Sequence, residues 1–336
     1  MAIQAKRAKG KSVESEGTKT AKAKPANAKA AKAKAAKPKP VKAKAVKAKR
    51  TGAAELDQMS ALEIASLMNR EDARVLRAVQ QVLPEIAKAI DVVAGRLERG
   101  GRLIYVGSGT SGRIGALEAA ECPPTFGIDP ETIQAMLAGG EAALARSSEG
   151  CEDSADLGKD DMAKRRPGKK DVVVGISASG RTAYTVGALR AARTQGAATI
   201  ALVSCKGSEL ARACALAIEA EVGAEVLAGS TRLKAGTAQK MICNMLTTGA
   251  MARLGYVYGD QMVHLQMSNA KLFKRGVAMV QRIAGVEREA AMTALEWAGW
   301  HVPLALLLLC SKVSRNEAVQ RLKRAGGNLR RALDDA

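Results

Sequence analysis

Three short turns rich in glycine and hydroxyl side chains are the groups in this chain most suited to binding an anion. Their sequences are GSGTSGR (residues 107–113), SASGRT (177–182) and GSTRLKAGT (229–237). The first two each follow a β-branched run and precede a helix-like stretch, so backbone N–H groups, hydroxyls and the positive end of a helix would converge there. This chemistry suits a phosphate group, and the sequence therefore predicts a phosphorylated ligand.

A nucleotide cofactor fits the first turn poorly. Gly107, Gly109 and Gly112 match the dinucleotide pattern G-x-G-x-x-G. However, Arg113 stands where a cofactor-binding helix is usually apolar, and no acidic residue ends a second strand about 20 residues later. The lysine of a Walker-type loop is also absent. A phosphate monoester on a small molecule is the better interpretation.

The elements that would position these turns alternate between strand and helix. Strand-like runs at 103–106, 172–176, 199–204 and 216–220 alternate with helix-like segments at 114–120, 184–192 and 235–254. This pattern predicts an α/β fold with a mostly parallel sheet covered by helices on both faces. The ligand is then expected beyond the carboxyl ends of the strands, where the turns fall.

The flanking regions predict further parts. Residues 60–98 indicate one or two amphipathic helices, beginning with a capping box at Ser60 and Glu63. From Ser268 the pattern is helical only, with breaks near Gly285, Gly299 and Gly326, and Trp297 and Trp300 are expected to be core residues. We expect a disordered Lys/Ala/Pro-rich tail at 1–52, a sugar-phosphate domain with its N-terminal helices at 53–270, and a small helical module at 271–336.

The positive charge of the chain is concentrated in the tail. The whole chain has a net charge of +20, and residues 1–50 contain 17 Lys or Arg against Glu14 and Glu16. Such a segment lacks the apolar residues needed to offset its ordering entropy. It could contact nucleic-acid phosphates without sequence preference, or be a solvated extension without function.

Membrane, redox and metal classes have little support. No run reaches the roughly 18 apolar residues of a membrane span, and no signal-peptide core follows the early charges. The six cysteines lack CxxC spacing, which fits a reducing cytoplasm. With only His264 and His301 available, acid and base roles fall to carboxylates or lysines.

Three stretches together resemble one family. GGRLIYVGSGTSGRIGALEAAECPPTFG (100–127), VVVGISASGRTAYTVGAL (172–189) and GAEVLAGSTRLKAGTAQKMICNMLTTGAM (223–251) are similar to the sugar isomerase (SIS) fold of the N-acetylmuramic acid 6-phosphate etherases, relatives of glucokinase regulatory protein. The ECPPT run at 121–125 and the EGCEDS run at 149–154 are the specific parts. The resemblance implies an SIS-type three-layer sandwich, a homodimer, and cleavage of a lactyl ether in amino-sugar recycling.

The resemblance also implies site residues. Glu121 occupies the proton-donor position and Glu152 the second catalytic position, with Glu118 and Glu141 as competitors. Two carboxylates with different pKa values can serve an elimination and the return of water, so no metal or redox cofactor is required. The expected phosphate ligands are Gly109, Thr110, Ser111, Arg113, Ser177, Ser179, Thr182, Arg232 and Lys234, with Arg181 as a further candidate for charge assistance.

Two alternatives remain at this stage. An aldose–ketose isomerase of the same fold would also remove a C2 proton but return it to C1. A non-catalytic sugar-phosphate sensor would bind the same ligand without turnover, and the basic tail could bring it to DNA.

Overall fold

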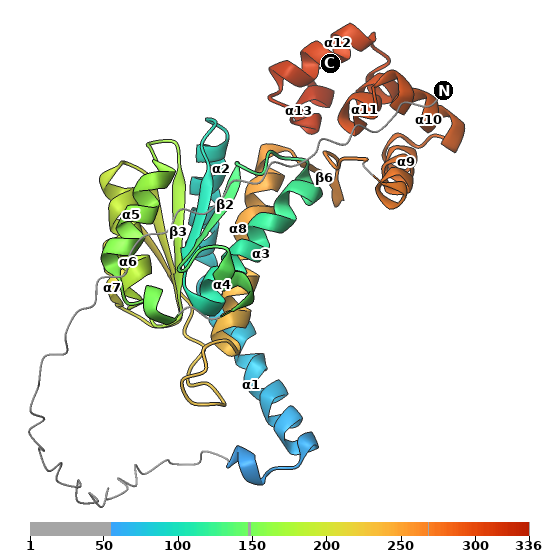
Figure 1. Ribbon diagram of the computed structural model, residues 1–336. Coiled ribbons are helices and arrows are strands. Elements are labelled where there is room, and N and C mark those ends of the chain that lie inside the picture. The colour runs from blue at the N-terminus through green and yellow to red at the C-terminus, as the bar shows by residue number, and fades with distance from the viewer. Residues whose placement is uncertain (1–54, 147–148, 268, 336) are drawn as a thin grey trace, which may run out of the picture. The chain divides into compact units, whose positions relative to one another are not determined.

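A five-stranded parallel sheet forms the centre of the chain (Figure 1). The computed structural model describes residues 55–146, 149–267 and 269–335, so the predicted tail at 1–52 lies outside the described residues. The strands pair in the order β2-β1-β3-β4-β5. Their bounds are β1 (Leu103–Gly107), β2 (Ile133–Leu137), β3 (Val172–Ser177), β4 (Ala198–Val203) and β5 (Leu216–Glu219).

The strands are buried on both faces because successive side chains enter two separate cores. In β1, Leu103 and Tyr105 belong to one core, whereas Ile104 and Val106 belong to the other. All residues of β1 and β3 are buried. A sheet with two apolar faces requires a helical layer on each, which is the predicted α/β sandwich.

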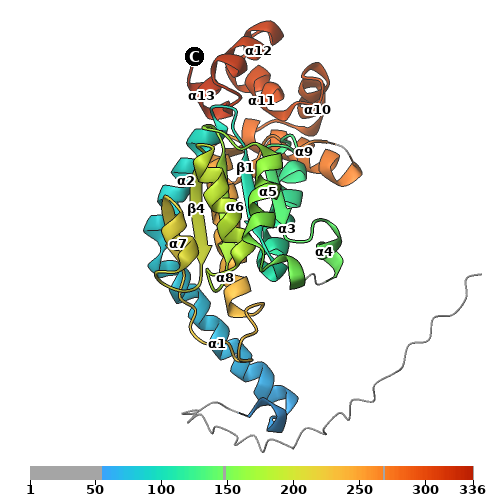
Figure 2. The same cartoon turned by 60° about the vertical axis from the view of Figure 1, so that its left-hand side comes forward.

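Two sets of helices provide these layers (Figures 1 and 2). One face is covered by α2 (Leu83–Leu97), α3 (Gly109–Phe126) and α8 (Lys234–Leu254), and the C-terminal part of α1 (Ala61–Gln81) packs on α8. The other face, toward the viewer in Figure 2, is covered by α5 (Ala155–Arg165), α6 (Ala183–Thr194) and α7 (Glu209–Ala213). The short elements are η1 (Leu56–Gln58), α4 (Ala142–Ala145) and η2 (Glu149–Cys151). The predicted capping box at Ser60 and Glu63 is confirmed.

A further core lies in the C-terminal part of the chain and is lined by residues such as Val277, Leu295 and Leu306. It is built after a small antiparallel pair, β6 (Val257–Tyr258) and β7 (Gln261–Met262). Its helices are α9 (Ala270–Ala284), α10 (Arg288–Trp297), α11 (Val302–Ser311), α12 (Arg315–Arg324) and α13 (Leu329–Asp334). The domain boundary at 270/271 stays a prediction.

The glycine breaks in this part are confirmed, but one prediction is wrong. Gly285, Gly299 and Gly326 all have positive φ and follow helices, as expected for C-terminal caps. Trp297 and Trp300, however, are 69% and 40% exposed rather than core residues. Helical spacing alone does not say which face of a short helix is buried.

Among the described residues, no single helix is long and apolar enough to cross a membrane. Within those same described ranges, the pair α10 and α11, counted together across a bend of 114°, meets the length and composition criteria.

Candidate active site

The structure brings the first two turns together at the carboxyl edge of the sheet. Strands β1 and β3 are neighbours, with Gly107 in register with Ile176. After β1 the chain enters α3 on one face, and after β3 it enters α6 on the other face. Doubly wound sheets bind ligands at the point where the strand order diverges in this way. The two predicted phosphate turns therefore lie side by side at this edge of the sheet, and we call the space beyond them the crevice.

The helices that begin at these two turns have open N-termini. Eight helices in the described part of the chain begin after a Ser, Thr or Asn, and in six of them that side chain accepts a backbone N–H in the first turn. The two exceptions are Ser108 before α3 and Thr182 before α6. Ser108 Oγ is buried and has no hydrogen-bond partner among the described residues. The first-turn N–H groups of α3, and those of α6 apart from the Tyr184 amide, which donates to the Glu152 carbonyl, are thus left for an external anion.

The first turn is held against the sheet by glycine. A Cβ on Gly112 would lie 2.1 Å from Leu137 Cδ1 and 2.6 Å from the Gly107 carbonyl oxygen. Any larger residue would push the start of α3 away from β1. Close packing therefore fixes the position of the Thr110 and Ser111 amides.

The second turn is ordered by its own hydroxyls. Ser177 Oγ and Thr182 Oγ1 are 2.9 Å apart, and the Gly180 amide donates to Ser177 Oγ at 3.0 Å. Ser177 is buried, whereas Ser179 is exposed and accepts the Arg181 amide through its Oγ. The turn therefore leaves Ser179 exposed shortly before α6 begins.

The third turn differs, because a carboxylate of the chain already occupies its helix N-terminus. Glu225 accepts the amides of Lys234 and Ala235 at 3.1 and 3.0 Å, at the start of α8. Lys234 is 1% exposed, and its Nζ lies 2.6 Å from Glu71 Oε2. The hydrogen bond from Lys234 lowers the pKa of Glu71. Lys234 is thus a buried counter-ion here, and its role as a phosphate ligand stays a prediction.

The three arginines proposed for charge assistance have different settings. The Arg113 guanidinium donates to the carbonyls of Ala143 and Leu144 at 3.0 Å, which ties α3 to α4. Arg181 and Arg232 are exposed. Arg113 ends the first turn and Arg181 lies within the second, whereas Arg232 lies in the third.

The two predicted catalytic carboxylates are both exposed but lie in different places. The Glu152 carbonyl accepts the Tyr184 amide at 3.0 Å, so Glu152 stands beside the first turn of α6. Glu121 lies eleven residues after Thr110 on α3, roughly 16 Å along the axis at 1.5 Å per residue. Only Glu152 is close to the phosphate turns within one chain.

The competing carboxylate Glu118 is buried and hydrogen-bonded to another helix. It is 6% exposed, accepts Asn244 Nδ2 at 2.6 Å and also accepts the Thr247 hydroxyl, both from α8. Burial raises its pKa, and the Thr247 hydrogen bond only partly opposes this. Glu118 therefore joins α3 to α8. Glu141, the other competitor, is exposed at the start of α4.

Sequence reasoning missed four polar residues near the site: Glu71, Glu118 as a buried anchor, Glu225 and Gln239. Gln239 is 1% exposed and accepts the Ser111 hydroxyl at 3.0 Å. The partners are separated by 128 residues for Ser111 and Gln239 and by 163 for Glu71 and Lys234. Glu225 also carried no local signal, because it lies nine residues before Lys234, outside the first turn in which acidic residues mark a helix start.

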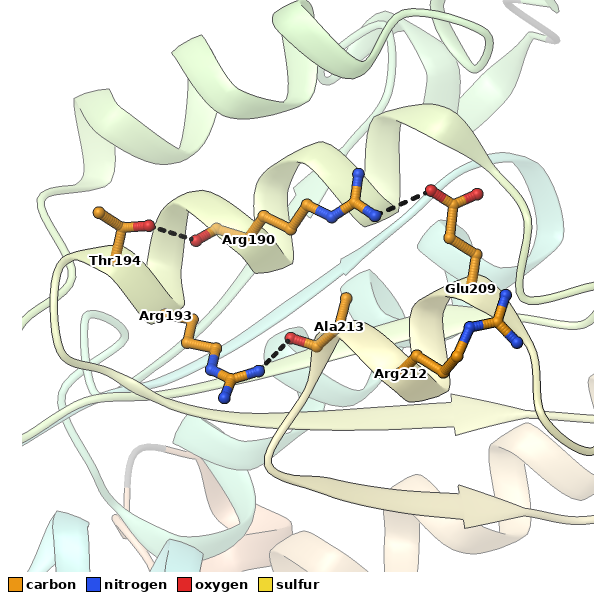
Figure 3. A pocket seen from close by; sticks show the side chains of 6 residues that line it. All are labelled: Arg190, Arg193, Thr194, Glu209, Arg212 and Ala213. Carbon is orange, nitrogen blue, oxygen red and sulfur yellow. Dashed lines mark hydrogen bonds and ion pairs between the residues drawn. The ribbon is translucent and has the colours of Figure 1, made fainter.

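A hollow of about 850 Å³ on the outer face of α6 and α7 is a separate feature (Figure 3). Its arginines are already engaged within the chain: Arg190 pairs with Glu209 at 3.0 Å, and Arg193 donates to the Ala213 carbonyl. It contains none of the turn residues, so it is separate from the predicted phosphate site.

Comparison with known proteins gives matches to three family profiles and to curated relatives. The glucokinase regulatory protein N-terminal SIS domain matches residues 85–193, the SIS domain matches 155–249, and the C-terminal lid domain of glucokinase regulatory protein matches 259–300. A solved structure, "E. coli CFT073 c3406 in complex with A5P", is similar with a TM-score of 0.43 and 24% identity, over 60% of this chain and 97% of that chain.

Three curated relatives cover most of the chain. The N-acetylmuramic acid 6-phosphate etherase of Clostridium beijerinckii is 44% identical over 83% of this chain and 92% of its own length. The N-acetylmuramic acid 6-phosphate etherase of Symbiobacterium thermophilum is 53% identical over 77% of this chain and 86% of its own length. That of Mycolicibacterium smegmatis is 46% identical over 84% of this chain and 95% of its own length. With an SIS-type α/β fold and identities of this size over nearly the full length of the relatives, the chain belongs to the N-acetylmuramic acid 6-phosphate etherase family.

Proposed function

We propose that the protein is a carbon–oxygen lyase that cleaves the lactyl ether of N-acetylmuramate 6-phosphate, giving N-acetylglucosamine 6-phosphate and D-lactate. The observation that carries this proposal is the pair of uncapped helix N-termini, α3 and α6, at the divergence point of the sheet. They suit a phosphate monoester, and the relatives of the chain are named for a reaction on one.

The chemistry needs one base and one acid. In the open-chain sugar, C1 is an aldehyde that acidifies the proton on C2, and the lactyl ether on C3 lies β to that carbonyl. Removal of the C2 proton and protonation of the ether oxygen expel lactate, and water then adds at C3. Phosphate binding would orient C2 and C3 so that these groups reach them.

Glu152 is proposed as the base. Its backbone is fixed beside the first turn of α6 by the Tyr184 amide, and Ser154, two residues on, caps α5. The carboxylate is exposed and therefore free to approach a sugar whose phosphate lies at the Ser177–Thr182 turn.

Glu121 is proposed as the acid of a neighbouring copy. At roughly 16 Å from Thr110 along α3, it is too far to reach the C3 oxygen of a sugar bound by the same chain. Around it, α3 carries an exposed stripe at helical spacing formed by Leu117, Ala120 and Pro124, with Leu117 49% exposed. We propose a homodimer that covers this stripe and sets Glu121 beside the partner's phosphate turns.

The compartment and the tail complete the proposal. A cytoplasmic location is supported by the free thiols of Cys122, Cys205, Cys214, Cys243 and Cys310. Non-specific nucleic-acid contact by residues 1–52 is supported by their 17 basic residues within the first 50 positions, and it rests on the sequence alone.

The proposed function is tested by measuring lactate release from N-acetylmuramate 6-phosphate for the wild type, Glu121→Gln, Glu152→Gln and, as a control of the same chemistry on exposed α10, Glu289→Gln. Release by the wild type and the control, with at least a hundredfold loss in the other two, is expected for acid–base residues. A folded wild type that binds the sugar phosphate without releasing lactate would favour the sensor instead.

Mixing the two inactive variants tests the shared site. Random pairing gives half mixed dimers, each with one intact site, so about a quarter of the wild-type activity should return. No recovery from variants shown to exchange subunits would place both carboxylates in one chain.

A further inference from the structure

A polar contact in the core links the first phosphate turn to α8. Gln239 lies in the second turn of α8 and is 1% exposed, and its Oε1 accepts the hydroxyl of Ser111 at 3.0 Å. The other half of the same carboxamide, Nε2, is buried and has no hydrogen-bond partner among the described residues. An amide nitrogen with two unused N–H donors is costly in a protein interior, so its retention points to a second arrangement in which it is paired.

The contact also decides what Ser111 can offer a ligand. A serine hydroxyl has one proton to donate, and in this arrangement Gln239 Oε1 accepts it. Ser111 Oγ then presents only lone pairs, which a phosphate oxygen does not bind. The predicted role of Ser111 as a phosphate donor therefore requires the proton to be released.

Rotation of the Gln239 carboxamide by half a turn frees the Ser111 proton. The terminal torsion of glutamine is roughly two-fold, so Nε2 and Oε1 can exchange places with little change in shape. Nε2 then donates to Ser111 Oγ, and the Ser111 hydroxyl points its proton elsewhere. Ser111 lies in the first turn of α3, where side chains lean toward the helix N-terminus. The released proton would therefore point toward an anion at that N-terminus.

We propose that Gln239 is a positioning residue for the phosphate group: its carboxamide turns over when an anion binds at the start of α3, so that Nε2 donates to Ser111 while Ser111 donates to a phosphate oxygen. This inference rests on the proposed function, because it assumes that the same turn binds the sugar phosphate. Neither glutamate, which only accepts, nor an apolar residue could make both arrangements.

The neighbouring structure holds Gln239 in place without depending on it. A Cβ on Gly236, one turn earlier in α8, would lie 3.5 Å from Thr110 Cγ2, so the start of α8 passes close to the start of α3. Further along, Asn244 and Thr247 of α8 both donate to Glu118 of α3. Removing the carboxamide should therefore leave the α3–α8 packing intact.

A double-mutant cycle tests the inference. The dissociation constant for N-acetylglucosamine 6-phosphate is measured by calorimetry for the wild type, Gln239→Met, Ser111→Ala and the double variant, with exposed Gln320→Met on α12 as the matched control. Ser111→Ala is expected to weaken binding roughly tenfold, the size of one charge-assisted hydrogen bond. Gln239→Met should approach that loss, because the Ser111 hydroxyl then lacks the donor that turns its proton toward the phosphate. Because Gln239 acts through Ser111, the double variant should bind no more than about twofold more weakly than Ser111→Ala. The control should match the wild type.

Other outcomes would overturn the inference. Unchanged affinity in Gln239→Met, or a double variant about a hundredfold weaker than the wild type, would show that Gln239 does not act through Ser111. Urea unfolding checks that each variant folds. If Gln239→Met does not fold, Gln239→Leu takes its place in the double-mutant cycle.

Catalytic readouts separate this inference from the proposed function. Gln239→Met should raise KM for N-acetylmuramate 6-phosphate and leave kcat near the wild-type value, because it alters phosphate binding rather than the reacting atoms. A wild type that shows the expected coupling but releases no lactate would refute the etherase proposal and leave this inference standing. Normal lactate release together with additive effects in the double-mutant cycle would refute this inference and leave the etherase proposal standing. A wild type that does not bind the sugar phosphate would refute both proposals.

Discussion

The ion pair between Lys234 and Glu71 gives the sharpest prediction about stability. The Nζ–Oε2 distance is 2.6 Å, and the exposed fractions are 1% for Lys234 and 19% for Glu71. Glu71→Gln leaves a buried ammonium without its counter-ion, which should cost about 3–5 kcal/mol of unfolding free energy. Lys234→Met should cost less, about 2–3 kcal/mol, because the remaining carboxylate is partly exposed and keeps Arg74 at 3.2 Å.

The double variant makes the prediction specific. With both charges gone, no buried ion is left unpaired, so Glu71→Gln with Lys234→Met should cost less than Glu71→Gln alone. Lys206→Met is the matched control, because Lys206 and Glu221 are also 2.6 Å apart but are 73% and 45% exposed. That control should lose no more than about 1 kcal/mol.

The assay is urea unfolding followed by far-ultraviolet circular dichroism, with KM for N-acetylmuramate 6-phosphate measured on the same proteins. The hydrogen bond from Lys234 lowers the pKa of Glu71 in the folded protein. The loss of unfolding free energy in Glu71→Gln should therefore be largest above the pKa of Glu71 in the unfolded chain, and it should shrink as the pH falls through the pKa of Glu71 in the folded protein. Additive costs in the double variant would refute the buried-pair account. A raised KM at unchanged stability in Lys234→Met would instead make Lys234 a phosphate ligand.

Three further predictions follow from the same structure. Since burial raises the pKa of Glu118, the unfolding free energy of the wild type should fall relative to Glu118→Gln as pH rises from about 4 to 7, and parallel pH profiles would contradict this. Gly180 has φ +60°, and a Cβ there would lie 2.2 Å from Ser208 Oγ, so Gly180→Ala should weaken binding of N-acetylglucosamine 6-phosphate and lower the unfolding free energy. Gly229→Ala is the control, because its Cβ would meet nothing within 4 Å, and it should lower the unfolding free energy less. Equal losses in urea unfolding would argue against close packing at Gly180. Deleting residues 1–50 should leave lactate release unchanged and remove salt-sensitive nucleic-acid binding, measured by fluorescence anisotropy at several salt concentrations, and lost turnover would show that the tail belongs to the enzyme.

The parts of the fold that the sequence predicts are those with continuous apolar runs. The predicted strand at 172–176 is β3 (Val172–Ser177), and the predicted helix at 235–254 is α8 (Lys234–Leu254). Strand β2 was not predicted, because Ile133 is its only β-branched residue and Gln134 interrupts the run. Helix α5 was missed because its sequence is mostly charged, and Met162 is its only buried large apolar side chain.

The start of α3 shows how a functional turn hides a helix. The predicted helix began at 114, whereas α3 begins at Gly109, inside the glycine-rich turn itself. Glycine is a poor helix former, so local propensity opposes this boundary. Packing decides it, because Gly112 fits against Gly107 and Leu137 only without a side chain. The helix N-terminus lies at the crevice for that reason.

The site was predictable as a set of turns but not as a network. The residue types and their place after strands indicated a phosphate crevice, and the structure brings the first two turns together there. The contacts of Ser111 with Gln239 and of Lys234 with Glu71 join residues more than a hundred positions apart. No local pattern carries such contacts, since they arise only when α3, α8 and α1 pack.

The most direct test of the central claim is the fate of solvent oxygen during the reaction. N-acetylmuramate 6-phosphate is incubated with the wild-type protein in water enriched in ¹⁸O, and both products are examined by mass spectrometry. Elimination followed by hydration predicts ¹⁸O at C3 of N-acetylglucosamine 6-phosphate and a lactate that keeps its original ether oxygen. Label in the lactate hydroxyl, or no lactate at all, would contradict the proposed lyase chemistry.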